Sequence, residues 1–298
     1  MNKISNIILL LVLSWFAISS VRADDNLVSS REISFKIGAQ SLVGTLVLPT
    51  NIKKPPIVLI LSGMSGLRNG PPIRGMNSAV FEVLSHTWAM RGIASLRVST
   101  RGRGGSEGDF RNMTLERRTE EALEAVDWIV AQDTFDASSI SVLGHSQGAL
   151  IAASVAKRND ICPLKSVILW APQIDALRTY RRAMGDTIFQ QGLSAKPREV
   201  VKWRSASGKV RAFRSDFYKT LSNFHAGEDL KNFPGRVLIV TGQRDRTSPT
   251  GSAKVFNSFV RNLTFMEFDV GHRMGASLGL QEFNEVSEAT LNWLDTNH

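Results

Sequence analysis

Short apolar runs alternate along the chain with segments in which apolar side chains recur every three or four positions. A continuous run of Val, Ile and Leu at 57–61 is typical of a strand buried on both faces, and further apolar segments predict strands at 93–98, 140–143, 167–170, 237–240 and 263–268. Helical spacing predicts helices at 78–90, 114–129, 149–156, 252–261 and 281–294. Strands and helices that alternate in this way predict an α/β fold with a mostly parallel sheet covered by helices on both faces.

Two segments depart from this alternation. Glu32–Ile37 and Leu42–Leu48 are separated by four turn-forming residues, which predicts an antiparallel hairpin at the start of the domain. Residues 174–232 fall between two predicted strands and show no clear strand pattern of their own. We therefore expect them to form an inserted lid of helices and loops.

The first residues are typical of a secretory signal peptide. Lys3 precedes an apolar run, Ile7–Ile18, and Ala23 occupies a position that a signal peptidase reads. The run is short for a membrane-spanning helix, which needs about 20 residues, although an uncleaved anchor is the alternative interpretation. We expect residues 1–23 to be removed, residues 24–298 to form one domain, and the protein to be periplasmic or secreted.

The composition excludes several kinds of site. Cys162 is the only cysteine, so the chain can form no intramolecular disulfide, and its neighbours Ile161 and Pro163 suggest a half-buried apolar role rather than a nucleophile. No group of Cys and His residues has the spacing of a metal site. We expect neither a metal nor a cofactor.

The motif Gly144-His145-Ser146-Gln147-Gly148 carries the strongest chemical signal. A predicted strand precedes it and a predicted helix follows it, and this strand–turn–helix context is what a nucleophile elbow requires. The turn holds the serine in strained backbone angles, and flanking glycines avoid clashes with the crossing backbone. We therefore interpret Ser146 as the nucleophile.

A serine hydroxyl needs a base and an acid that orients the base. His272 follows the last predicted strand, and Asp245 follows the strand before it, at the sheet edge where α/β proteins place ligands. Their order, Ser146, Asp245, His272, is the order this architecture uses. Asp269 is the competing acid, only three residues before His272. His145 lies inside the elbow and is expected to point away from the reaction.

An oxyanion hole needs two backbone N–H donors. Gln147, directly after the nucleophile, is expected to supply one. Met64, in the loop after the strand at 57–61, is expected to supply the other because Gly63 permits the turn that presents its amide.

With these residues the chain resembles α/β-hydrolase-fold serine hydrolases, and most of all the cinnamoyl/feruloyl esterase-like branch, which is related to the serine aminopeptidase and dienelactone-hydrolase-like groups. The resemblance is carried by Ile93–Arg97, the glycine-rich turn Arg101–Gly108, Phe110–Thr114, the elbow, and the Asp245 and His272 loops. It implies an α/β-hydrolase fold with a helical lid and hydrolysis of small carboxylic esters through an acyl-enzyme. Two positions depart from many relatives: Ser62 stands where they have His, and Ser99 where they have Asp.

Charge is concentrated in the insertion. The chain has a formal net charge of +9, and residues 174–232 contain 12 Lys and Arg against 6 Asp and Glu. These bases have two interpretations: a solvated face over a small aromatic core, or a surface that attracts an anionic substrate or an anionic envelope surface. No recognition motif accompanies the charge, so we expect no nucleic-acid partner. The aromatic residues open to the same two interpretations, core or substrate pocket, are Trp203, Phe213, Phe217, Tyr218 and Phe224.

Three functions remain open at this point. The first is a carboxylic ester hydrolase. The second uses the same triad as a peptidase, thioesterase or acyltransferase, because the shape of the lid decides the acceptor. The third is a non-catalytic binding protein on a hydrolase scaffold. The natural substrate and the oligomeric state do not follow from the sequence.

Overall fold

The computed structural model describes residues 27–158, 164–205 and 208–295. The predicted signal peptide and Cys162 lie outside these residues. No helix in the described ranges combines the length and the hydrophobicity needed to cross a bilayer.

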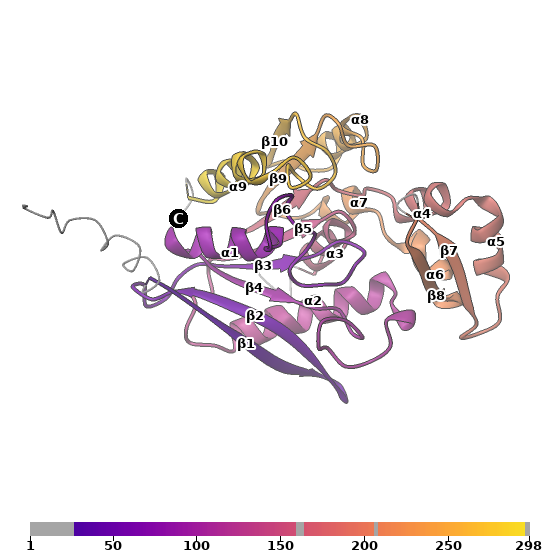
Figure 1. Cartoon of the computed structure of the whole chain (residues 1–298), viewed down its shortest axis with the longest axis horizontal. Helices are drawn as coiled ribbons and strands as arrows, with labels where there is room; N and C mark the ends of the chain where they lie inside the picture. The colour runs from indigo at the N-terminus through magenta and orange to yellow at the C-terminus, as the bar shows by residue number, and fades with distance from the viewer. Residues whose placement is uncertain (1–26, 159–163, 206–207, 296–298) are drawn as a thin grey trace, which may run out of the picture.

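An eight-stranded sheet runs through the molecule in the order β1-β2-β4-β3-β5-β6-β9-β10 (Figure 1). The hairpin of β1 and β2 pairs antiparallel to β4, and all later neighbours are parallel. The strands are β1 (Val28–Ile37), β2 (Gln40–Pro49), β3 (Ile57–Leu61), β4 (Ala94–Val98), β5 (Ile140–His145), β6 (Ser166–Trp170), β9 (Arg236–Gly242) and β10 (Leu263–Phe268). The predicted mostly parallel sheet of an α/β-hydrolase is confirmed.

Helices cover both faces of the sheet, because alternate strand residues point to opposite sides. In β3, Leu59 packs into the core with residues of α2 and α3, whereas Ile60 packs into the core with residues of α1 and α9. The four helices are α1 (Val80–Met90), α2 (Leu115–Val130), α3 (Gln147–Ala156) and α9 (Leu280–Asp295). Shorter segments, α8 (Thr250–Ala253) and η4 (Lys254–Ser258), follow β9, where one helix is predicted at 252–261.

The insertion between β6 and β9 projects to the right of the sheet in Figure 1. The prediction that it contains no strand is wrong, because β7 and β8 form an antiparallel hairpin. In β7, apolar and charged residues alternate, with Val201 and Trp203 buried and Lys202 exposed between them. The high Lys and Arg content hides this period-two pattern. The elements are α4 (Ala176–Met184), α5 (Asp186–Ser194), β7 (Val200–Arg204), β8 (Val210–Arg214), α6 (Ser215–Thr220), η3 (Leu221–Asn223) and α7 (Ala226–Leu230).

The aromatic residues of the insertion form its core. Phe213 and Phe217 are fully buried and their ring centroids lie 4.5 Å apart. Phe217 also makes an edge contact with Tyr180, at 5.0 Å between centroids. The interpretation as a small aromatic core therefore describes the packing of these rings.

Candidate active site

Ser146 sits at the turn between β5 and α3 with φ 57° and ψ −116°. A non-glycine residue adopts such a positive φ only where the surrounding fold enforces it. The flanking glycines show why the motif is needed: a Cβ on Gly144 would lie 2.2 Å from the Gly148 carbonyl oxygen, and a Cβ on Gly148 would lie 2.1 Å from the Leu61 carbonyl oxygen. The Ser146 backbone N–H donates to the Trp170 carbonyl at 2.9 Å and ties the turn to β6.

The structure brings the three predicted triad residues together. The Nε2 atom of His272 lies 2.8 Å from Ser146 Oγ, and its Nδ1 atom lies 2.8 Å from Asp245 Oδ2. Because a carboxylate can only accept, Nδ1–H donates to Asp245 and Nε2 is left to accept from the serine hydroxyl. This is the tautomer that a general base requires.

Asp245 is fixed by the loop that follows β9. Its side chain is fully buried, and Oδ1 accepts from the backbone N–H groups of Thr247 at 2.7 Å and Ser248 at 2.9 Å. The competing Asp269 is exposed and paired with Arg244, and this hydrogen bond lowers the pKa of the Asp269 carboxyl. Geometry therefore favours Asp245 as the acid.

His145 does not point away from the site, so that prediction is wrong. Its ring lies 5.2 Å from the ring of His272 between centroids, and its Nε2–H donates to the His272 backbone carbonyl at 2.8 Å. Burial, and secondly the neighbouring His272, lowers the pKa of His145 to about 4. A neutral imidazole therefore holds the loop that carries the base. The other described histidines are elsewhere: His86 is exposed on α1 and His225 caps α7.

The two predicted oxyanion donors lie on segments that adjoin the nucleophile. Gln147 is the first residue of α3, and the loop of Met64 passes the elbow so closely that a Cβ on Gly63 would lie 3.4 Å from Ser146 Cβ. Within the described residues, the backbone N–H groups of Met64 and Gln147 donate no hydrogen bond to another part of the chain. Both donors are therefore available to a ligand.

Arg118, which the sequence analysis missed, donates hydrogen bonds to both of these segments. It is buried on α2, and its guanidinium donates to the carbonyls of Ser62 at 2.7 Å and Gly63 at 3.2 Å and to Gln147 Oε1 at 2.5 Å. The Gln147 amide in turn donates to the Tyr180 hydroxyl of α4 at 2.5 Å. An arginine on the core-facing stripe of α2 was the available signal, because that stripe is otherwise largely apolar.

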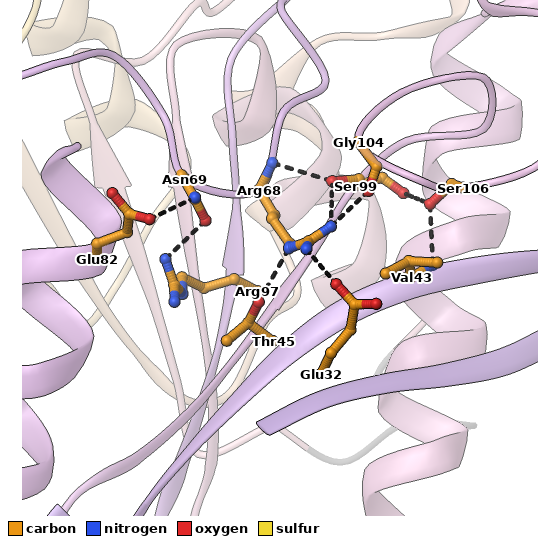
Figure 2. Close-up of polar contacts among 10 residues, drawn as sticks. All are labelled: Glu32, Val43, Thr45, Arg68, Asn69, Glu82, Arg97, Ser99, Gly104 and Ser106. Carbon is orange, nitrogen blue, oxygen red and sulfur yellow. Dashed lines mark hydrogen bonds and ion pairs between the residues drawn. The ribbon is translucent and has the colours of Figure 1, made fainter. Parts of the chain in front are cut away.

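A polar network anchors the remainder of the Met64 loop (Figure 2). Arg68 donates to Thr45 Oγ1 at 2.9 Å, to the Gly104 carbonyl at 2.5 Å and to Glu32 at 2.5 Å. The hydroxyl of Ser99, where many relatives have Asp, accepts from the Arg68 backbone N–H at 3.3 Å. The loop is thereby tied to β1, β2 and the glycine-rich turn.

A second buried arginine extends this network on the other side. Arg97 of β4 donates to Asn69 Oδ1 at 2.8 Å, and the Asn69 amide donates to Glu82 of α1 at 2.6 Å (Figure 2). Burial lowers the pKa of Arg97 to about 10, so the guanidinium is still charged at neutral pH. In this network the glycine-rich turn has a structural role, because its Gly104 carbonyl accepts from Arg68 of the Met64 loop.

Comparison with known proteins identifies the family and the fold of the chain. The sequence matches the model of the X-Pro dipeptidyl-peptidase (S15) family over residues 40–209. No curated protein sequence matches the chain significantly. Among solved structures, Est1E from Butyrivibrio proteoclasticus with ferulic acid bound is 20% identical, with a TM-score of 0.70 over 89% of this chain and 98% of that chain.

Two further structures have the same fold. An esterase domain from Rhodothermus marinus is 16% identical, with a TM-score of 0.65 over 89% of this chain and 97% of that chain. A chain described as a dipeptidyl aminopeptidase IV from Bacteroides ovatus is 14% identical, with a TM-score of 0.62 over 92% of this chain and 36% of that chain. Since the family model spans more than half of its 298 residues, the chain belongs to the X-Pro dipeptidyl-peptidase (S15) family of α/β-hydrolase-fold serine hydrolases.

Proposed function

We propose that this hydrolase cleaves carboxylic esters through an acyl-enzyme on Ser146. The observation that carries the proposal is the continuous pair of 2.8 Å contacts from Ser146 Oγ through His272 to Asp245. A serine with only a structural role would not need the strained backbone angles of Ser146, whereas a nucleophile at a strand–turn–helix elbow adopts them.

The reaction proceeds in two halves. His272 Nε2 takes the proton of Ser146 as Oγ attacks the ester carbonyl, and Asp245 stabilises the imidazolium that forms. The tetrahedral oxyanion accepts hydrogen bonds from the Met64 and Gln147 backbone N–H groups. His272 then gives its proton to the leaving alkoxide, which departs as the alcohol and leaves the acyl group on Oγ. Water, deprotonated by His272, then attacks the acyl carbon. As the bond from the acyl carbon to Oγ breaks, His272 returns the proton to Oγ, which releases the acid and restores the serine.

An ester substrate is favoured over a peptide because this chain covers a larger share of the esterase structures than of the peptidase structure. The Est1E and Rhodothermus chains are covered almost entirely by this chain, at 98% and 97%, whereas only 36% of the dipeptidyl aminopeptidase IV chain is covered. The ferulic acid bound to Est1E is a carboxylic acid, the class of product that ester hydrolysis releases. Peptidase activity is the second candidate, because the family is defined by X-Pro dipeptidyl-peptidases.

A panel of matched chromogenic substrates tests the proposal. Wild type is expected to release 4-nitrophenol from acyl and cinnamoyl esters, and Ser146→Ala to lose this activity. X-Pro 4-nitroanilides test the peptidase alternative. Cleavage of the anilides with no cleavage of the esters would replace ester hydrolysis by peptidase activity. A folded wild type that cleaves nothing in the panel would favour the non-catalytic binding protein.

We also propose export from the cytoplasm, on the support of the apolar run Ile7–Ile18 and the cleavage position at Ala23. Expression of the full chain in a Gram-negative host is expected to give periplasmic protein that begins at Asp24. N-terminal sequencing checks this, and a cytoplasmic protein that keeps residues 1–23 would contradict it.

A further inference from the structure

A cavity of about 510 Å³ lies between the glycine-rich turn and the hairpin of the insertion. Residues from 102 to 111 form one wall, and residues 210–213 of β8 form the other. None of the triad residues lines it. The cavity is therefore a separate feature that the proposed reaction does not yet use.

Three arginines line this cavity, and one of them has a partner. Arg111 is paired with Asp109, the one acidic residue of the lining, with Nη2 2.9 Å from Oδ2. Asp109 Oδ2 also accepts a hydrogen bond from Arg214 Nη2 at 3.4 Å. The contacts with Arg111 and Arg214 lower the pKa of the Asp109 carboxyl to about 2. Its negative charge is thus already shared between two guanidinium groups.

The other two arginines, Arg103 and Arg211, have no acidic partner in the part of the chain that the structure describes. Neither forms a salt bridge or donates a side-chain hydrogen bond there, and the Nε atom of each is buried without an acceptor. Both residues line the same cavity, and buried donors are almost always satisfied in native proteins, so this unsatisfied pair points to a missing acceptor.

The two side chains also repel each other. Burial, and secondly the positive charge of Arg211, lowers the pKa of Arg103. Arg103 is held in place by Phe110, because its guanidinium carbon lies 4.0 Å above the ring centroid. Stacking occupies the face of the guanidinium and leaves its in-plane N–H groups free to donate. Fixed, unpaired guanidinium groups of this kind fit the oxygen atoms of a carboxylate or phosphate.

We propose that this cavity binds an oxyanion, a carboxylate or a phosphate, between the guanidinium groups of Arg103 and Arg211. The oxyanion is either a terminal carboxylate of the ester substrate, an assignment that rests on the proposed ester hydrolysis, or a separate ligand of the same chemistry. A series of contacts between buried side chains runs from the cavity wall to the elbow: Phe213 packs on Phe217, Phe217 on Tyr180, and Tyr180 accepts from Gln147.

Binding is tested without turnover, in the Ser146→Ala background, by calorimetry with inorganic phosphate and with glutarate. We expect one anion per chain, and an affinity at least about tenfold weaker when Arg103→Gln and Arg211→Gln are added. The matched control is Arg178→Gln with Arg182→Gln, which removes two charges from exposed positions on α4 and is expected to change affinity less than twofold. No binding, or equal weakening in both double variants, would overturn the site.

Thermal melting provides a second readout that guards against misfolded variants. In the absence of added anion, Arg211→Gln in the Ser146→Ala background is expected to melt at the same Tm as Ser146→Ala or higher, because one of two repelling charges is removed. Phosphate is expected to raise the Tm of the parent and not of the variant. A phosphate-dependent rise of the same size in both proteins would contradict the proposal.

The source of the oxyanion is decided by a matched ester pair, 4-nitrophenyl hydrogen suberate and its neutral methyl ester. If the substrate carries the anion, wild type is expected to prefer the charged ester about tenfold in kcat/KM, and the Arg103→Gln/Arg211→Gln variant is expected to lose that preference. An unchanged preference together with phosphate binding would keep the site but overturn its assignment to the substrate. Failure to cleave either ester would overturn the proposed hydrolysis, while the binding result would still stand.

Discussion

The parallel sheet and the insertion bury their apolar side chains in different ways. In the sheet, strands such as β3 and β6 are buried throughout, and their side chains pack into two cores, one on each face. In the insertion, a compact set of aromatic rings is covered by a surface where Lys and Arg outnumber Asp and Glu by 12 to 6. The sheet positions the triad, whereas the insertion adds charge and one buried contact to the elbow. If the proposals above hold, the sheet supplies the chemistry and the insertion contributes to selectivity.

The largest effect is expected where the sheet supplies the triad acid. Asp245→Asn should lower kcat by about 10⁴-fold, because an amide at this position favours the wrong tautomer of His272. The matched control is Asp269→Asn, which breaks an exposed ion pair and should change kcat less than about twofold. Steady-state kinetics on a 4-nitrophenyl ester measure both. The reverse ranking would transfer the acid role to Asp269.

The next effect tests how the sheet side of the site holds its oxyanion donors. Arg118→Met should lower kcat by about 10²–10³-fold, because the Met64 and Gln147 segments lose their common anchor. Arg117→Met, on the exposed side of α2, is the control and should have little effect.

A boronic acid inhibitor separates positioning from simple destabilisation in Arg118→Met. Its affinity should fall in proportion to kcat/KM, since both depend on the oxyanion donors. Arg118→Lys should recover only part of the loss, because lysine lacks the forked donors. Full activity in a folded Arg118→Met protein would remove this residue from the account.

His145 gives the sheet a pH-dependent contribution to stability. Its pKa is about 4 in the folded protein, against an ordinary value of 6.5. As the pH falls, the unfolded chain takes up this proton first, so stability that is present above pH 6.5 is lost between about pH 6.5 and 4. The loss is on the order of 3 kcal/mol.

Urea unfolding at several pH values measures this contribution. His145→Gln should flatten the acid limb of the free energy of unfolding relative to wild type. His86→Gln, at an exposed position of α1, should leave the limb unchanged. An identical acid limb in wild type and His145→Gln would contradict the buried neutral imidazole.

The smallest effect concerns the contact between the insertion and the elbow. Tyr180→Phe removes the hydroxyl that accepts from Gln147 and should lower kcat by several-fold to about tenfold, as expected for the loss of one buried hydrogen bond. Tyr218→Phe removes a hydrogen bond to the Val201 carbonyl inside the insertion and is the matched control. Both variants should lose similar thermal stability, but only Tyr180→Phe should lose kcat. Equal kinetics would make the insertion independent of the elbow.

The two regions also differ in how far the sequence predicts them. Strand β3 begins and ends where its apolar run predicts, because burial on both faces leaves a continuous signal in the sequence. The bounds of β10 also match the prediction, although its residues are partly buried or exposed. The convergence of Ser146, Asp245 and His272 follows from loops at one edge of a parallel sheet. In the insertion, Lys202 and Arg204 alternate with buried Val201 and Trp203, and the charge concealed the strand β7.

Long-range polar contacts account for what the sequence does not predict in the site. Arg118 reaches Ser62, 56 residues away, and His145 reaches the carbonyl of His272, 127 residues away. No local sequence pattern predicts contacts between residues so far apart in the sequence. The sign that something is unusual is local, namely an arginine on the buried face of α2, but its partners appear only when α2, β3 and β5 are packed together.

The central claim is that Ser146 carries the acyl group during turnover. Rapid acid quenching of wild type with a 4-nitrophenyl ester, followed by peptide mass spectrometry, tests this most directly. The expected result is a mass increase of one acyl group on the peptide that contains Ser146, matched by a burst of 4-nitrophenol and absent in Ser146→Ala. Steady ester turnover with the acyl group on another residue, or an undiminished burst in Ser146→Ala, would contradict it.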